Sequence, residues 1–238
     1  LGAEESEDSY MPTELAFLRN LYAHNATEII QRTPKTMRNV AGYNLASLNP
    51  NQENLAQLLV GSEGTLAFFV RLRLKLKPLL RSRVLGICHF NGLLEALDTV
   101  QHIVKLNPTA VELVDQNVLS LGARHPDFRS AMSDFVTGTP KALLLVEFAE
   151  ELPGTEMGGK LNELEELLGE LGHPNSVVRA ETEALQSAAW SVRKAGLNIV
   201  MSMAGPRKPI SFIEDCAVPL EHLSNYARHV DDIFSRHG

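Results

Sequence analysis

Residues 38–77 read RNVAGYNLASLNPNQENLAQLLVGSEGTLAFFVRLRLKLK, and the second half of this stretch alternates apolar and polar side chains. The apolar positions are Leu66, Phe68, Val70, Leu72, Leu74 and Leu76, and the cations Arg71, Arg73, Lys75 and Lys77 lie among the later ones. A period of two is typical of a β-strand with one buried face and one solvated face. We therefore expect a strand over residues 66–77, closed by Pro78.

A glycine-rich turn precedes this expected strand. Gly61, Ser62, Glu63, Gly64 and Thr65 follow the apolar run at residues 58–60. Glycines let backbone N–H groups approach a ligand closely, and phosphate oxygens suit such a turn. An ordinary connecting turn would use the same glycines, and composition alone favours that simpler interpretation.

Three consecutive motifs together resemble one family. They are NVAGYNL at residues 39–45, LVGSEGTL at residues 59–66, and the alternating segment that follows. The combination resembles the FAD-linked oxidases of the vanillyl-alcohol oxidase type, in the branch of D-lactate dehydrogenase, D-2-hydroxyglutarate dehydrogenase and the flavin subunit of glycolate oxidase. The family usually has Asp at position 44 and Gly at position 67, where this chain has Asn44 and Ala67. Asn44 can form hydrogen bonds but carries no charge.

The resemblance implies FAD as the cofactor, with these motifs lining its site late in a flavin domain. The residues implied to contact the cofactor are Gly42, Tyr43, Asn44, Gly61, Ser62, Glu63, Gly64 and Thr65.

Composition and charge limit the remaining classes of function. The 238 residues are 44% hydrophobic, with a formal net charge of −7 and a pI of about 5.6. This acidic balance argues against a nucleic-acid partner, and an anionic substrate would need local positive charge. No apolar run approaches the ~20 residues of a membrane span, and no signal-peptide pattern opens the chain, so we expect a soluble, cytoplasmic protein without a membrane span.

The chain has two cysteines and an acidic beginning. Cys88 and Cys216 are flanked by apolar residues in strand-like segments, so we expect buried, reduced thiols. Leu1 is followed by an acidic stretch and no initiator Met is present, and we expect a piece cut from a longer polypeptide.

Periodicity predicts a helix at residues 12–32, a short helix at residues 52–59, and alternating strands and helices after residue 81. The later expected strands cover residues 83–90, 110–114, 142–148, 176–180 and 210–217, and the later expected helices cover residues 93–106, 160–171, 182–200 and 219–237, with further helical segments up to about residue 136. This spacing predicts an α+β fold whose antiparallel sheet is ferredoxin-like, with helices on one face. The resemblance implies the end of a flavin-binding domain at residues 1–80, followed by a truncated substrate cap domain at residues 81–238.

Trp190 and Arg193 are three residues apart on an expected helix and therefore share a face. Arginine offers a planar fork for a carboxylate, although a solvated Arg beside a core Trp is the commoner arrangement. The resemblance implies that Arg193 grips the substrate carboxylate and that Lys208 also reaches the substrate. Lys208 could equally be an exposed loop charge.

Other polar residues give no second site. Glu214 and Asp215 are adjacent in an expected strand and would point to opposite faces, so they do not form an acid–base pair. No pair among the eight histidines has a convincing ligand spacing with a third partner, so we expect no metal site in this chain. Three glycines at residues 153–159 fit a flexible surface loop. The resemblance implies that the metal site and catalytic base lie beyond Gly238, and that the segments binding the FAD pyrophosphate lie before Leu1.

Two hypotheses of function remain. The resemblance implies part of an FAD-dependent dehydrogenase that oxidises a small 2-hydroxyacid to a 2-oxo acid, with an unknown electron acceptor. The alternative is an α+β binding or assembly module without bound flavin or turnover.

Overall fold

The computed structural model describes residues 13–37, 42–52, 54–201, 210, 213 and 216–237. By their contacts these residues divide into two compact units. The first ends at Lys75 and also takes in residues from 213–217, and the second begins at Leu76. Each unit is described by itself.

The first unit is helical. Its elements are α1 (Thr13–Arg32), the 3₁₀ turns η1 (Leu45–Leu48) and η2 (Pro50–Gln52), and α2 (Ala56–Leu59). A small core joins Tyr22 and Ile29 of α1 to Leu48 and Leu58. Helix α1 confirms the expected helix at residues 12–32 over its described part, and Pro34 explains its end, because a residue before proline avoids the helical region. The helix expected at residues 52–59 is shorter and begins at Ala56.

The strand expected at residues 66–77 is wrong. This segment has no regular secondary structure, and its six alternating apolar side chains are between 41% and 91% exposed. A strand needs a neighbour for its backbone N–H and C=O groups, and none of the four strands in the described part of the chain pairs with this segment. The alternation is therefore present in the sequence without a sheet to bury its apolar face.

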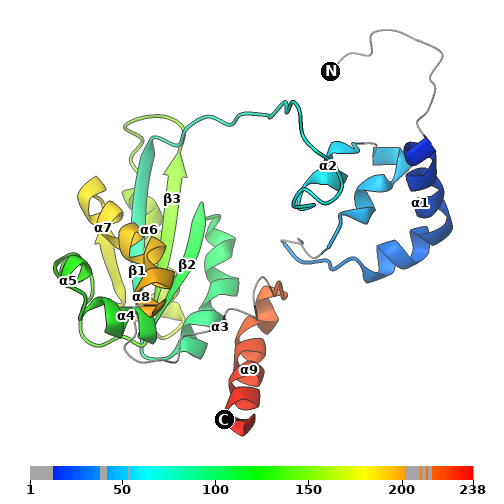
Figure 1. Cartoon of the computed structure of the whole chain (residues 1–238). Helices are drawn as coiled ribbons and strands as arrows, with labels where there is room; N and C mark the ends of the chain where they lie inside the picture. Colours follow the sequence, from blue (N-terminus) through cyan, green and yellow to red (C-terminus); the bar gives the residue numbers. More distant parts are fainter. Residues whose placement is uncertain are drawn as a thin grey trace. The chain divides into compact units, whose positions relative to one another are not determined.

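The second unit is built on a four-stranded antiparallel sheet with strand order β2-β3-β1-β4 (Figure 1). The strands are β1 (Ser82–Phe90), β2 (Ala110–Asp115), β3 (Ala142–Glu150) and β4 (Val177–Ala180). Helix α3 (Leu93–Ile103), extended by the turn η3 (Val104–Leu106), connects β1 to β2, and α6 (Gly158–Glu170) connects β3 to β4. Each connection passes between two strands that are separated by a third, so the α+β class and the two split βαβ units are as expected.

Helices cover both faces of this sheet, so the expectation of helices on one face is wrong. Helices α3 and α6 share one core with Val146 of β3, and a second core on the opposite face joins Leu145 of β3 to the remaining covering helices. Those helices are α4 (Gln116–Gly122), α5 (Pro126–Ser133), α7 (Glu183–Lys194) and α8 (Gly196–Met201). The sequence signal is the unbroken apolar run at residues 142–146, which is typical of a strand buried on both faces.

Three C-terminal expectations differ from the structure. The single helix expected at residues 182–200 is interrupted at Ala195 between α7 and α8. Residues 210, 213, 216 and 217, the described part of the expected strand at 210–217, lie in no strand, so their side chains have no sheet layer to pack in. Cys216 is consequently exposed, whereas Cys88 on β1 is buried as expected. The last helix, α9 (Leu223–His237), follows the turn η4 (Leu220–His222) and packs against α3.

Candidate functional site

Helix α7 places Trp190 and Arg193 over the sheet face that carries Glu112 and Glu147. Its N-terminus is capped by Thr182, whose hydroxyl accepts a hydrogen bond from the N–H of Leu185 at 3.4 Å. Because Trp190 and Arg193 are one helical turn apart, both reach the same face. The expected pairing of these two residues on one helix face is thus present in the structure.

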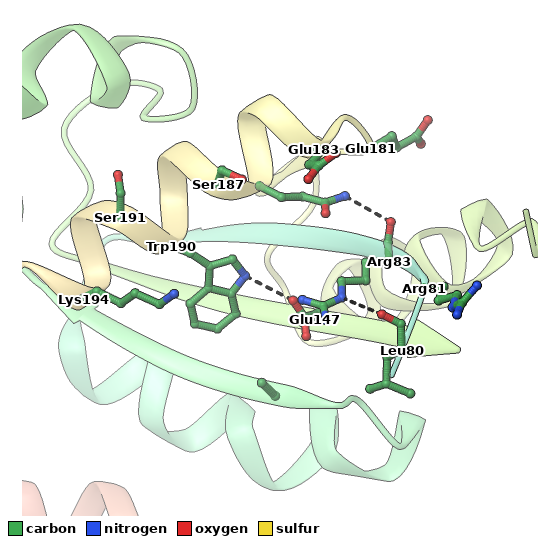
Figure 2. Close-up of a pocket in the computed structure, with 12 residues that line it drawn as sticks. Leu80, Arg81, Arg83, Glu147, Glu181, Glu183, Ser187, Trp190, Ser191 and Lys194 are labelled. Carbon is green, nitrogen blue, oxygen red and sulfur yellow. Dashed lines mark hydrogen bonds between the residues drawn. The ribbon is translucent and has the colours of Figure 1, made fainter. Parts of the chain in front are cut away.

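The indole of Trp190 is anchored to a buried carboxylate. Its Nε1–H donates to Oε2 of Glu147 at 3.2 Å, and Glu147 is only 8% exposed (Figure 2). Glu147 lies on β3, one of the two central strands of the sheet, and pairs with Leu85 of the other central strand, β1. A buried carboxylate without a hydrogen-bond donor is costly, so the contact fixes α7 against β3.

Arg193 is held by a second carboxylate, one strand further out. Its Nε donates to Oε2 of Glu112 at 3.0 Å, and its Nη2 lies 2.9 Å from the same oxygen. The two side chains are 44% and 40% exposed, so this ion pair is open to solvent. Among the residues that the structure describes, the Arg193 guanidinium has no other partner, and its Nη1 is free of contacts to acceptors.

A cavity of ≈ 830 Å³ opens beside Trp190 on this face (Figure 2). Three cations and three carboxylates line it together with Trp190: Arg81, Arg83, Lys194, Glu147, Glu181 and Glu183. Trp190 borders the cavity. Arg193, one helical turn later, does not line it and binds Glu112 instead. The near balance of charge gives the cavity a polar, two-sign lining.

Glu181 at the cavity rim is itself fixed by Arg179 of β4. Arg179 Nε donates to Glu181 Oε1 at 2.9 Å, and this hydrogen bond is the main cause that raises the pKa of Arg179. The same guanidinium binds Glu165 of α6 at 3.1 Å and the carbonyl of Gly158 at 3.2 Å. This arginine therefore ties β4 to the start and the middle of α6.

In the first unit, the two glycine-containing motifs meet through a side-chain hydrogen bond. The hydroxyls of Tyr43 and Thr65 lie 2.8 Å apart. The turn between them is tightly bent, with positive φ at Gly61, Glu63 and Gly64 (80°, 50° and 76°). Its second residue, Ser62, is 2% exposed, and its hydroxyl donates to the carbonyl of Leu59 at 2.9 Å.

A second cavity, of ≈ 470 Å³, lies between α1 and the loop that carries Gly42, Tyr43 and Asn44. All three residues line it, and Asn44 also reaches the carbonyl of Gln57 at 3.5 Å. Residues 61–65 do not line this cavity, but they follow Val60, which does, and Thr65 is hydrogen-bonded to Tyr43. The structure therefore brings three of the expected cofactor residues around one cavity and places the other five in an adjoining turn.

The family model described as FAD linked oxidases, C-terminal domain, matches residues 79–238. The chain belongs to this family. The matched range of this FAD-linked oxidase domain includes both pairs described above, Trp190 with Glu147 and Arg193 with Glu112.

Curated relatives extend the similarity into the first unit. The chain is 31% identical over 223 residues to D-2-hydroxyglutarate dehydrogenase of Escherichia coli, covering 88% of this chain and 22% of that protein. It is 26% identical over 216 residues to glycolate oxidase subunit GlcD of Bacillus subtilis, of which it covers 40%, and 26% identical over 211 residues to D-lactate dehydrogenase of Archaeoglobus fulgidus, of which it covers 41%. The chain thus spans about a fifth of the first relative and about two fifths of the others. The resemblance drawn from the motifs at residues 39–45 and 59–66 is confirmed.

Some expectations fall on residues outside the described part of this FAD-linked oxidase chain. Lys208, Glu214 and Asp215 are among them. Within the described ranges, no three His, Cys, Asp or Glu side chains gather as a metal site would require, and no helix is long and apolar enough to cross a membrane.

The sequence interpretation missed the two carboxylates that hold Trp190 and Arg193. Glu112 and Glu147 each stand between apolar residues of a strand, in VELVD and LLLVEF. An acidic residue on the inward face of such a strand needs a partner, and this was the available signal.

Proposed function

We propose that this chain forms part of an FAD-dependent dehydrogenase that oxidises a 2-hydroxyacid to a 2-oxo acid. In this proposal residues 1–80 are the C-terminal part of the flavin-binding domain and residues 81–238 form the substrate cap. Bound FAD supplies the acceptor for the hydride that leaves C2 of the substrate. The names of the relatives suggest D-2-hydroxyglutarate, D-lactate and glycolate as the substrates to test first.

One observation carries the proposal for the substrate side of the site. Arg193 presents a half-exposed guanidinium, and Glu112 binds one edge of it. The other edge of this guanidinium can bind a carboxylate. A protein with a net charge of −7 needs such a local cation to bind an anion. Lys208, by its resemblance to the family lysine, is the second proposed contact to the substrate.

The first unit has features that fit FAD. Apart from the adjacent residues in the chain, no described atom would lie within 4 Å of a Cβ at Gly42, Gly61 or Gly64, so the backbone at these three positions is open to a close neighbour. Because φ is positive at three residues of the turn, its peptide groups point in other directions than they would in a strand or a helix. Turns of this kind can present backbone N–H groups to phosphate oxygens. Tyr43, Asn44, Ser62, Glu63 and Thr65 would supply the polar contacts around it.

The test uses the full-length protein loaded with FAD. Anaerobic addition of D-2-hydroxyglutarate, D-lactate or glycolate is expected to bleach the flavin absorbance, with the matching 2-oxo acid as product. Failure of all three to reduce the flavin would contradict the proposal. A full-length protein that retains no flavin would favour the binding or assembly module instead.

Arg193→Lys tests the proposed grip on the substrate. An ammonium group cannot offer two parallel N–H groups to a carboxylate, so KM is expected to rise and kcat/KM to fall by about ten- to hundredfold, the equivalent of one charge-assisted hydrogen bond. Steady-state kinetics with an artificial electron acceptor measures this. Arg129→Lys, at an exposed position of α5, is the matched control and should leave both constants unchanged. Unchanged kinetics in Arg193→Lys would remove this residue from the site.

A further inference from the structure

Two carboxylates on neighbouring strands hold one turn of α7. Trp190 binds Glu147 of β3, and Arg193 binds Glu112 of β2. In the sheet register, Ala110 of β2 pairs with Glu147, so Glu112 lies two positions along the neighbouring strand on the same face. Both anchors are therefore built on regular strands, which hold a side chain more precisely than loops do.

The two anchors differ in what they leave accessible. Glu147 is buried beneath the indole, whereas the Glu112–Arg193 pair is open to solvent. A guanidinium has a side edge, made by Nε and one Nη, and an end edge, made by its two Nη groups. Glu112 takes the side edge, because Nε and Nη2 both approach its Oε2. The end edge, with Nη1 and the second N–H of Nη2, has no acceptor among the described residues and matches the spacing of a carboxylate.

We propose that Glu112 is a positioning residue, which holds Arg193 by its side edge so that its end edge receives the substrate carboxylate. The inference rests on the function proposed above for Arg193. An unrestrained arginine side chain would have to lose its rotamer freedom at the moment of binding, and Glu112 removes that cost in advance. The Trp190–Glu147 contact, one helical turn earlier, fixes the helix from which Arg193 extends.

The experiment measures substrate affinity in the full-length, FAD-loaded protein. Glu112→Ala is expected to raise KM about ten- to hundredfold for whichever of D-2-hydroxyglutarate, D-lactate or glycolate the parent oxidises, because the arginine loses its fixed geometry. The Kd of the matching 2-oxo acid, measured by calorimetry without turnover, should rise by the same factor. Glu112→Gln keeps an acceptor oxygen for Nε and Nη2, and it is expected to restore most of the affinity. A glutamine variant as impaired as the alanine variant would overturn the positioning role.

A double-mutant cycle separates positioning from general stability. Glu112→Ala is expected to add less than about a twofold change in KM and Kd when Arg193→Ala is already present, since there is then nothing to position. If Glu112→Ala has the same effect with and without Arg193, its role is structural and the proposal is wrong. The matched control is Glu165→Ala, which removes a similarly exposed Glu–Arg pair between α6 and β4 and should leave both constants at parent values.

The outcomes distinguish this inference from the function on which it rests. If Arg193→Ala leaves KM and Kd unchanged, the proposed role of Arg193 fails and the role of Glu112 fails with it. If Arg193→Ala impairs binding while Glu112→Ala matches the parent, the role of Glu112 alone is refuted. If Glu112→Ala lowers the yield of folded protein, Glu112→Gln and Glu112→Asp are compared with the parent instead. Glu112→Asp has a shorter carboxylate side chain, and an unchanged affinity in this variant would contradict the proposal.

Discussion

The hydrogen bond between Trp190 and Glu147 gives a stability prediction that can be worked from the structure. Trp190→Phe keeps an aromatic ring but removes the Nε1–H that lies 3.2 Å from the buried carboxylate. Because Glu147 is only 8% exposed, water has little access to replace the lost donor. A hydrogen bond to a charged group contributes about 1.5–3 kcal/mol, and the smaller ring loses about 1 kcal/mol of burial, so we expect a destabilisation of about 2.5–4 kcal/mol.

Urea denaturation followed by far-ultraviolet circular dichroism measures this change. Fluorescence is unsuitable, because Trp190 is the one tryptophan in the chain. Glu147→Gln retains an acceptor for the indole and is the matched control, with an expected loss below about 1 kcal/mol. Trp190→Phe combined with Glu147→Leu removes both partners and should be more stable than Trp190→Phe alone.

Two results would refute this reasoning. One is a loss below about 0.5 kcal/mol in Trp190→Phe, which is the range of an ordinary surface substitution. The other is a double variant that is no more stable than Trp190→Phe alone, since removal of the carboxylate would then not relieve the loss of its donor.

Three further predictions concern packing, thiol chemistry and the glycine turn. Gly86→Ala would place a Cβ in steric conflict with Leu164 Cδ2, so urea denaturation should show a loss of about 1–3 kcal/mol. Gly169→Ala on α6, where a Cβ would meet no described atom within 4 Å beyond its chain neighbours and its own helix backbone, should instead be stabilising by about 0.5–1 kcal/mol. Burial raises the pKa of the Cys88 thiol, so a thiol reagent should label exposed Cys216 rapidly and Cys88 only at the rate of unfolding. The folded state then holds a proton that an unfolded thiol releases, so the contribution of Cys88 to stability should fall as pH rises above the ordinary thiol pKa, and rapid labelling of both cysteines would contradict this. Gly64→Ala imposes a side chain at φ 76° and should lower the Tm of the apoprotein, with a loss of FAD affinity beyond that effect if the turn contacts the cofactor; unchanged FAD affinity would make Gly64 only a turn residue.

Local sequence patterns predicted most elements of the second unit and the family. The apolar runs at β1, β2, β3 and β4 and the helical periodicity between them identified the α+β class, because these signals depend on near neighbours in the chain. The motifs at residues 39–45 and 59–66, together with the alternating segment after them, identified the family. Gly61 and Gly64 in the second motif occupy backbone conformations that few other residues adopt.

The tertiary structure decided which patterns find a partner. The alternation at residues 66–77 satisfies every local requirement of a strand, yet a ladder requires a second strand, and the described residues contain none beside it. The second helical layer over the sheet likewise became visible only when α4, α5, α7 and α8 were placed in space.

The site shows the same division between local and long-range information. The shared helix face of Trp190 and Arg193 follows from a three-residue spacing that the sequence contains. Their partners Glu112 and Glu147 are 81 and 43 residues away along the chain, and only the register of β2 against β3 brings the two carboxylates onto one face under α7. Sequence periodicity reports on the face of a single element, whereas the identity of the side chains opposite that face depends on how the strands pair.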